Sequence, residues 1–169
     1  MKYQKSEYKH KKSVFNKLFG KLSTESQFDY RDTPDFTSYT EIINIHSIFA
    51  WVFNKNPGIA LEAAKSIHRL VKNTSVNQKK DLYNSLKNIQ LNREILHHFD
   101  KFPEEIKDSL LCIATLNSNG RVREEALNRL SENITFKSIP YVIYRLADWV
   151  PLIKEKAESI IRNLINRNR

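Results

Sequence analysis

One short pattern occurs twice between residues 117 and 164, and it limits the possible folds more than any other feature of the sequence. Each copy begins with Asn or Asp. An aliphatic residue follows five positions later, a basic residue six positions later and an alanine nine positions later. The matched pairs are Asn117 and Asp148, Val122 and Ile153, Arg123 and Lys154, and Ala126 and Ala157, each offset by 31 residues. A fixed period of this size is typical of stacked-repeat proteins.

The residues around each copy predict a unit of helix, tight turn and helix. Apolar residues recur at helical spacing over 122–130 and 153–164, and again before each turn, over 103–116 and 139–146. Pro151 suits the first turn of a helix, where its missing N–H would be unpaired in any case. We expect Asn117 and Asp148 to bond forward to Arg123 and Lys154 and to the helix start. Trp149 is expected to pack between adjacent units.

The two copies resemble the HEAT repeat, in particular the short form common in bacterial proteins. That family has Asp, four residues, then Val-Arg, with Ala four positions after the Val. Lys154 replaces the arginine in one copy, and Asn117 replaces the aspartate in the other. A weaker third copy has Asn54, Ile59, Ala63 and Ile67, with Ala60 in the place of the basic residue, and lies 63 residues before the middle copy.

The resemblance implies an all-α protein: a right-handed α-solenoid of antiparallel helix pairs, a superhelix of the HEAT-like or armadillo type. We expect about four pairs over residues 39–169, with the second helix of each pair on the concave side. Residues 1–38 form a basic tail and an acidic linker in this interpretation. Alanine at the central position of each copy allows a close approach between helices.

Composition and length agree with one globular domain preceded by a tail. The chain has 169 residues, a net charge of +9 and only three glycines. Its single cysteine, Cys112, lies in an apolar run and is expected to be a small core residue. We see no secretory signal and no apolar run of the roughly 20 residues that a membrane span needs, so we expect a cytoplasmic protein.

Positive charge is concentrated in two parts of the chain. Residues 1–22 hold seven lysines, and Phe15, Leu18 and Phe19 give this segment an amphipathic spacing. It either docks on the first repeat as a frayed terminus or binds an anionic membrane or nucleic acid. The second concentration lies in residues 55–93, which include the predicted helices 59–71 and 78–89 and the start of the one over 92–99 and follow a largely apolar helix over 40–53. Its candidate binding residues are Lys65, Arg69, Lys72, Lys79, Lys80 and Lys87.

Other residue clusters favour structural interpretations. His97, His98 and Asp100 lack the spacing of a metal site, and we expect one of the two histidines in the core and the other in water. His46 lies in an apolar helix and is expected to be a hydrogen-bonded core residue. No nucleophile-and-base spacing, phosphate loop or zinc motif occurs, and no cofactor is implied.

These observations lead to two functional hypotheses. The first is a non-enzymatic HEAT-like scaffold that binds protein, which we favour because the second helices of the two clear repeats carry mixed charge. The second is a nucleic-acid-binding module that uses the basic residues, with a HEAT-like alkylpurine DNA glycosylase as its least favoured form. The apolar stripe of the last helix, which includes Ile160, Ile161, Leu164 and Ile165, predicts self-association, a partner or further repeats at that end. The alternative is that the stripe packs within its own chain.

Overall fold

The computed structural model describes residues 35–36, 45–74, 79–86 and 89–167, except for the side chains of residues 79–81. The chain divides into two units, Met1–Asp35 and Phe36–Arg169, and the description below concerns the second unit. Its described residues form α-helices, 3₁₀ helices and connecting turns, without a strand, so the predicted all-α class is confirmed. The predictions for Phe15, Leu18, Phe19 and Lys87, and for the part of the first helix before Ile45, lie outside the described residues.

The first helix pair consists of α2 (Ile45–Phe49), the 3₁₀ helix η3 (Ala50–Phe53) and α3 (Pro57–Asn73). Asn56 ends the turn between them, and its side chain accepts hydrogen bonds from the N–H groups of Gly58 and Ile59. Pro57 occupies the first helical position, where no N–H is needed. The apolar helix predicted over 40–53 is therefore a short α-helix followed by a 3₁₀ turn in its described part.

The second pair is the least regular of the four. Its members are α4 (Lys79–Leu86) and the 3₁₀ helix η5 (Glu94–Lys101). The predicted pair is present, but the second member is a 3₁₀ helix that starts and ends two residues later than expected. The Asn92 side chain accepts a hydrogen bond from the N–H of Ile95 at its start, and Pro103 follows shortly after its end.

The last two pairs contain the clear sequence repeats. They are α5 (Glu104–Ala114) with α6 (Gly120–Glu132), and α7 (Ile139–Tyr144) with the 3₁₀ helix η6 (Arg145–Ala147) and α8 (Pro151–Arg167). Helix α8 begins at Pro151, as predicted. The unit of helix, tight turn and helix is confirmed for both copies.

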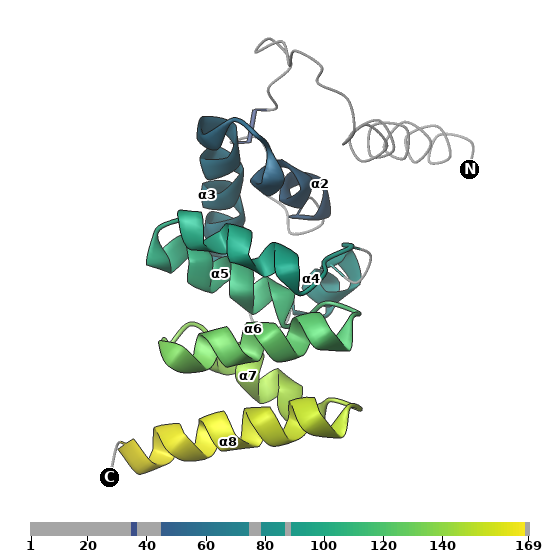
Figure 1. The fold of residues 1–169 in the computed structure, drawn as a ribbon, viewed down its shortest axis with the longest axis vertical. Helices are drawn as coiled ribbons and strands as arrows, with labels where there is room; N and C mark the ends of the chain where they lie inside the picture. The colour runs from purple at the N-terminus through teal and green to yellow at the C-terminus, as the bar shows by residue number, and fades with distance from the viewer. Residues whose placement is uncertain (1–34, 37–44, 75–78, 87–88, 168–169) are drawn as a thin grey trace, which may run out of the picture. The chain divides into compact units, whose positions relative to one another are not determined.

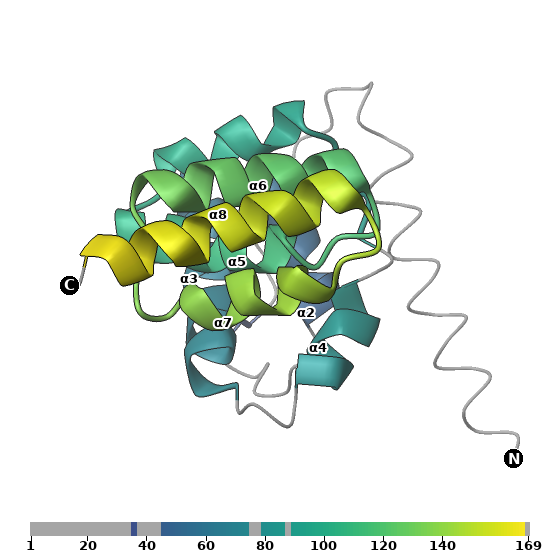
Figure 2. The same cartoon turned by 90° about the horizontal axis from the view of Figure 1, so that it is seen from below.

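Helices that lie near one another in the sequence also pack together in space. Helix α3 packs on α5, α5 on α6, and α6 on α8, while α7 lies against α8. Figure 1 shows α3, α5, α6 and α8 from top to bottom in chain order. Figure 2, viewed from the α8 end, shows α6 and α7 on different sides of α8. The first pair therefore contacts the third directly through α3 and α5, and the third contacts the fourth through α6 and α8.

The core consists of two groups of buried side chains. The larger group extends from Phe36 to Tyr141, and the smaller group contains Leu127, Val142, Ile153, Ala157 and Ile160. Ala126 and Ala157 are both fully buried, as expected for positions where helices approach closely. Cys112 lies in the larger group, so its prediction as a core residue is confirmed.

Two apolar positions, Phe36 and Ile143, differ from expectation, and Ile165 is exposed as the apolar stripe of the last helix predicts. Phe36, in the expected linker, is buried, and its carbonyl accepts a hydrogen bond from the Ser66 hydroxyl. Helical spacing predicts that Ile143 faces inward, but it is 50% exposed, because the buried side of α7 is the one that contains Tyr141 and Val142. Ile165 is 53% exposed at the end of α8.

No helix among the described residues is both long and apolar enough to cross a membrane.

Candidate functional site

The predicted basic residues do not form a single described cluster. Lys65, Arg69 and Lys72 are exposed on α3, and the Lys65 ammonium is 2.8 Å from a carboxylate oxygen of Glu62. Lys79 and Lys80 belong to α4, but their side chains, like residue Lys87, lie outside what the structure describes. The structure thus brings three of the six residues onto one helix.

Three turns share one hydrogen-bond geometry, and these turns are the matched starts of the three sequence copies. Oδ1 of Asn54, Asn117 and Asp148 accepts the N–H two residues later, at 2.8, 2.9 and 3.0 Å respectively. In each case the residue's own N–H donates to the carbonyl three residues earlier, at 3.0, 3.2 and 3.0 Å. The N–H six residues after each turn residue donates to the carbonyl of the second residue after it, which starts the following helix.

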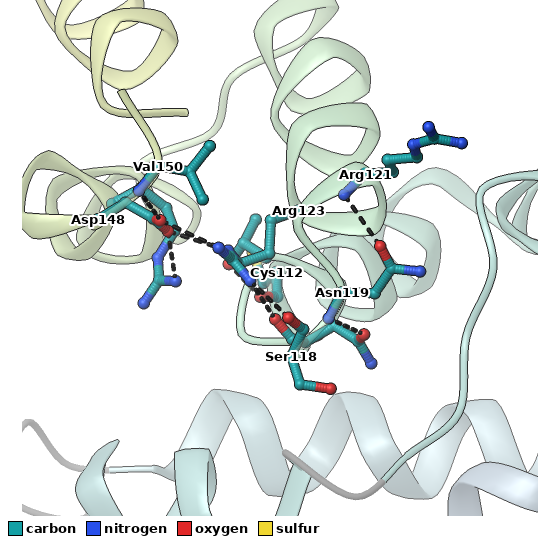
Figure 3. Close-up of polar contacts among 10 residues, drawn as sticks. Cys112, Ser118, Asn119, Arg121, Arg123, Asp148 and Val150 are labelled. Atoms are coloured by element: carbon teal, nitrogen blue, oxygen red, sulfur yellow. Dashed lines mark hydrogen bonds and ion pairs between the residues drawn. The ribbon is translucent and has the colours of Figure 1, made fainter. Parts of the chain in front are cut away.

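A buried ion cluster links the last two helix pairs (Figure 3). Arg123, from α6, donates from Nε and Nη2 to the two carboxylate oxygens of Asp148, at 2.9 and 3.0 Å. Its Nη1 donates to the carbonyls of Asn117 and Ser118, at 3.0 and 2.9 Å. Arg145 donates from Nη1 to Asp148 at 2.9 Å. The exposed fractions of the Arg123, Asp148 and Arg145 side chains are only 3%, 1% and 8%.

This geometry corrects the predicted pairing within each repeat. Asn117 binds Arg123 through its main-chain carbonyl, and its side chain is used by the turn. Asp148 binds Arg123 of the preceding copy, and Lys154 is exposed. The reason is that Arg123 lies on the side of α6 that faces α8, whereas Lys154 occupies the corresponding outward side of α8.

The carboxylate and guanidinium groups of the cluster perturb one another. Burial would raise the pKa of Asp148, but hydrogen bonds from Arg123 and from the N–H of Val150, with the charges of both arginines, lower it below its ordinary value. Burial lowers the pKa of Arg145, and the charge of Asp148 opposes this change. Two guanidinium groups share a single carboxylate, so the cluster keeps one net positive charge.

Aromatic side chains lie on both sides of this cluster. The Tyr144 ring centroid is 4.5 Å from Cζ of Arg145, and the Tyr83 ring on α4 is 6.3 Å from Tyr144. Trp149 lies 5.9 Å from Cζ of Arg123 and is 83% exposed. The prediction that Trp149 packs between adjacent units is therefore wrong, because the turn directs its ring outward across Arg123 towards solvent.

A second polar group joins α3 to α5. His68 Nδ1 lies 2.8 Å from the Ser109 hydroxyl, and His68 Nε2 lies 4.0 Å from a Glu105 carboxylate oxygen. These residue types resemble a hydrolytic triad, but the Ser109 hydroxyl can donate its proton to the Glu105 carbonyl at 3.1 Å and is buried. This arrangement is that of a hydrogen-bonded helix contact. Nearby, burial raises the pKa of Asp108, which accepts a hydrogen bond from Thr135.

Among the described residues, no three His, Cys, Asp or Glu side chains are grouped so that they could hold a metal ion, and His97 Nδ1 lies 3.8 Å from an Asp100 carboxylate oxygen. His97 and His98 are both exposed, so the expectation that one lies in the core is wrong. The 3₁₀ geometry of η5 places both side chains outward, with His98 at 6.0 Å from the Phe53 ring. His46 is half-buried, and its Nδ1 is 3.3 Å from the Ser47 hydroxyl.

Sequence reasoning missed the role of Arg145 and the position of the Arg123–Asp148 pair. A signal for Arg123 was present, since it lies one position after Val122 and four before Leu127, on the side of the helix that contacts the next pair. No such signal indicated Arg145, because the apolar residues of 139–146 predict a different buried side from the observed one, which contains Tyr141, Val142 and Arg145.

Comparison with models of known protein families, with curated proteins and with solved structures finds no match. The HEAT-like interpretation therefore rests on the motif residues and on the geometry described above.

Proposed function

We propose that this chain is a HEAT-like repeat protein, an α-solenoid of helix pairs, that acts as a non-enzymatic scaffold for another protein. The observation that carries the proposal is the turn that recurs at Asn54, Asn117 and Asp148 with the same hydrogen bonds. A unit that repeats its turn geometry at intervals of 63 and 31 residues is what a stacked-repeat architecture requires.

The bond between Arg123 and Asp148 supports the same interpretation. It joins the helix of one copy to the turn of the next, so the Asp148 turn both starts α8 and binds α6. In a solenoid, such contacts between neighbours supply much of the stability, because each unit buries its apolar side only against adjacent units.

Exposed apolar side chains support protein binding. Among the residues that the structure describes, the exposed large hydrophobic side chains come from the last helix pair and the loop before it: Phe136, Ile143, Tyr144, Trp149, Leu152 and Ile165. These side chains belong to one stretch of the chain, which favours an interaction there. We therefore place the partner surface on this part of the chain.

Charge on the second helices also favours a protein partner. On α6, Glu125 pairs with Arg93 at 3.0 Å, and Arg129 pairs with Asp100. A surface that follows a phosphate backbone would carry basic residues with few carboxylates. Carboxylates and guanidinium groups are instead interleaved along this helix.

Nucleic-acid binding remains the second candidate, favoured by exposed Arg69 and Lys72 on α3. Phosphate binding would lose affinity steeply between about 50 and 200 mM salt, because condensed counterions are released. We expect short duplex DNA and RNA to change the fluorescence anisotropy little even at low salt. Tight binding with a steep salt dependence would favour the second candidate.

The proposal is tested by affinity capture with the intact chain, repeated after nuclease treatment. We expect a protein partner that survives nuclease and moderate salt. Loss of every partner after nuclease treatment would contradict the scaffold proposal. A variant chain with Trp149→Ala and Leu152→Ala tests whether the exposed apolar side chains bind the partner. These changes remove exposed apolar area outside the buried core, so they should weaken capture without lowering the melting temperature.

A further inference from the structure

In the ion cluster between α6 and α8, one guanidinium edge is not hydrogen-bonded within the part of the chain that the structure describes. Arg123 donates hydrogen bonds to Asp148 from the guanidinium edge formed by Nε and Nη2. Arg145 reaches the same carboxylate only through Nη1. Its Nε is buried and has no hydrogen-bond partner among the described residues. Leaving such a donor unpaired costs free energy, so an acceptor at this edge would stabilise the site.

The free edge has the geometry and charge to bind a carboxylate. The parallel N–H groups of an arginine edge match the two oxygens of a carboxylate, as Arg123 and Asp148 demonstrate within the same cluster. Among the described residues that affect the Arg145 guanidinium, Asp148 is the only carboxylate; the others are the Arg123 guanidinium and the uncharged rings of Tyr144 and Tyr83. One further negative charge would balance the cluster.

The surroundings of Arg145 suit the side chains of a protein rather than a row of phosphates. Tyr144 covers the guanidinium at 4.5 Å and is 44% exposed, and Ile143 beside it is 50% exposed. Trp149 extends the exposed aromatic surface on the Arg123 side of the cluster. Rotation of the half-exposed Tyr144 ring, a movement that exposed side chains make within nanoseconds, would open access to Nε.

We propose that Arg145 binds a carboxylate from an acidic protein segment, and that Tyr144 and Trp149 pack against apolar residues next to it. This inference rests on the proposed scaffold function and specifies the chemistry of its partner. The segment supplies an Asp or Glu side chain or a terminal carboxylate to Nε and Nη2 of Arg145. A nucleic acid is disfavoured here because a single unpaired edge beside apolar side chains does not match regularly spaced phosphates.

The test follows the side-chain Nε–H resonances of the arginines by NMR during titration of the full chain. Sodium acetate is the first probe, with sodium chloride at equal ionic strength as the reference. We expect a saturable shift of Arg145 Nε–H, while Arg123 Nε–H, already bonded to Asp148, stays unchanged. A shift of Arg145 no larger with acetate than with chloride would overturn the proposal.

A pair of synthetic peptides separates a protein ligand from a free anion. One alternates glutamate and leucine, and the other has glutamine in place of every glutamate. We expect the glutamate peptide to bind at least tenfold more tightly than the glutamine peptide, and more tightly than inorganic phosphate or a single-stranded oligothymidylate. Equal binding of the two peptides, or tighter binding of the oligonucleotide through Arg145, would contradict the assignment.

Three variants complete the experiment. Arg145→Met should abolish both the acetate and the peptide response, and Asp148 keeps its bidentate bond from Arg123 in this variant. Tyr144→Ala removes only a half-exposed ring, so acetate should still bind while peptide affinity falls at least threefold. Arg162→Met, on an exposed position of α8, is the matched control and should change neither. A response that survives Arg145→Met, or is lost equally in Arg162→Met, would overturn the site.

The failure of this site and the failure of the scaffold proposal have different signatures. If a captured partner survives nuclease and binds Arg145→Met and Tyr144→Ala as tightly as the unaltered chain, the scaffold proposal stands and the Arg145 site is wrong. If acetate and the glutamate peptide bind at Arg145 but every captured partner is lost after nuclease, the site stands and the scaffold proposal is wrong.

Discussion

The Asp148 carboxylate binds two guanidinium groups, so its negative charge contributes more to the stability of the fold than the charge of an exposed acid. Removing one partner of a buried ion pair commonly costs about 3 to 5 kcal/mol, because the remaining charge is left uncompensated. Here the loss would leave Arg123 and Arg145 facing each other without a counter-charge. The cost should appear in the free energy of unfolding.

We predict that Asp148→Asn lowers the free energy of unfolding at pH 7 by about 3 to 5 kcal/mol. The pKa of Asp148 is lowered in the folded state, so its contribution is complete above the unfolded pKa of about 4 and is lost as the pH falls through the folded pKa. The difference between Asp148→Asn and the unaltered chain should therefore narrow at pH 3. Urea denaturation monitored by circular dichroism at both pH values measures this difference in the free energy of unfolding.

Asp108→Asn is a matched control, because its expected effect on the free energy of unfolding has the opposite sign. Burial raises the pKa of Asp108 in the folded state, so its ionised form costs stability at neutral pH, and the cost disappears as the pH falls below the unfolded pKa. Asp108→Asn keeps an acceptor for the Thr135 hydroxyl and should leave stability at pH 7 unchanged or higher. Equal losses in both variants at pH 7 would show that the Asp148 cluster contributes nothing specific.

At the scale of the helices, the close contacts depend on small residues at two matched positions. Ala126 on α6 and Ala157 on α8 are fully buried at the middle of their helices. Extra methylene groups in such a contact force neighbouring side chains out of their preferred rotamers, or the helices apart.

We predict that Ala126→Leu and Ala157→Leu each lower the free energy of unfolding by about 1 to 3 kcal/mol. Ala147→Leu makes the same chemical change at an exposed position of η6 and should have little effect. Thermal denaturation of the three variants provides the comparison. Melting temperatures unchanged in both core variants would mean that the alignment of the two copies is wrong.

Periodicity in the sequence was sufficient for the regular helices and insufficient for the short ones. Val122, Ala126 and Leu130 marked the buried side of α6, because regular α-helix keeps one phase over several turns. In α7 the buried side contains Tyr141, Val142 and Arg145 rather than the side that its apolar residues predict. The 3₁₀ segment η5 breaks the helical phase, and His98 is exposed there. Local periodicity contains no information on such changes of helix type.

The candidate site was less predictable than the fold for a related reason. Arg123 and Asp148 were both recognised as repeat positions, but each was assigned to its own copy. The bond between them runs from one copy to the next, so it depends on the packing of α6 against α8. The outward direction of Trp149 depends on the same packing.

At the scale of the whole unit, the sides of α6 and α8 that correspond under the repeat are chemically different. Arg123 and Leu127 on α6 face the next helix pair and are buried. Their counterparts on α8 are Lys154, which is exposed, and Glu158, which is half-buried. One side of α8 corresponds to the contact surface of α6, and charged residues occupy the first half of that side. Its second half has apolar residues, the half-buried Ile161 and the exposed Ile165.

This distribution predicts weak self-association through the end of α8. Burying one isoleucine side chain contributes about 1.5 to 3 kcal/mol, which corresponds to a tenfold or larger change in an association constant. We expect concentration-dependent sedimentation at tens of micromolar in analytical ultracentrifugation, and Ile165→Glu should weaken the association at least tenfold. Leu152→Glu is the control, because Leu152 is similarly exposed but lies on a different side of α8. A chain that sediments as a monomer throughout this range would exclude self-association, and an equal effect of both variants would place the contact elsewhere on α8.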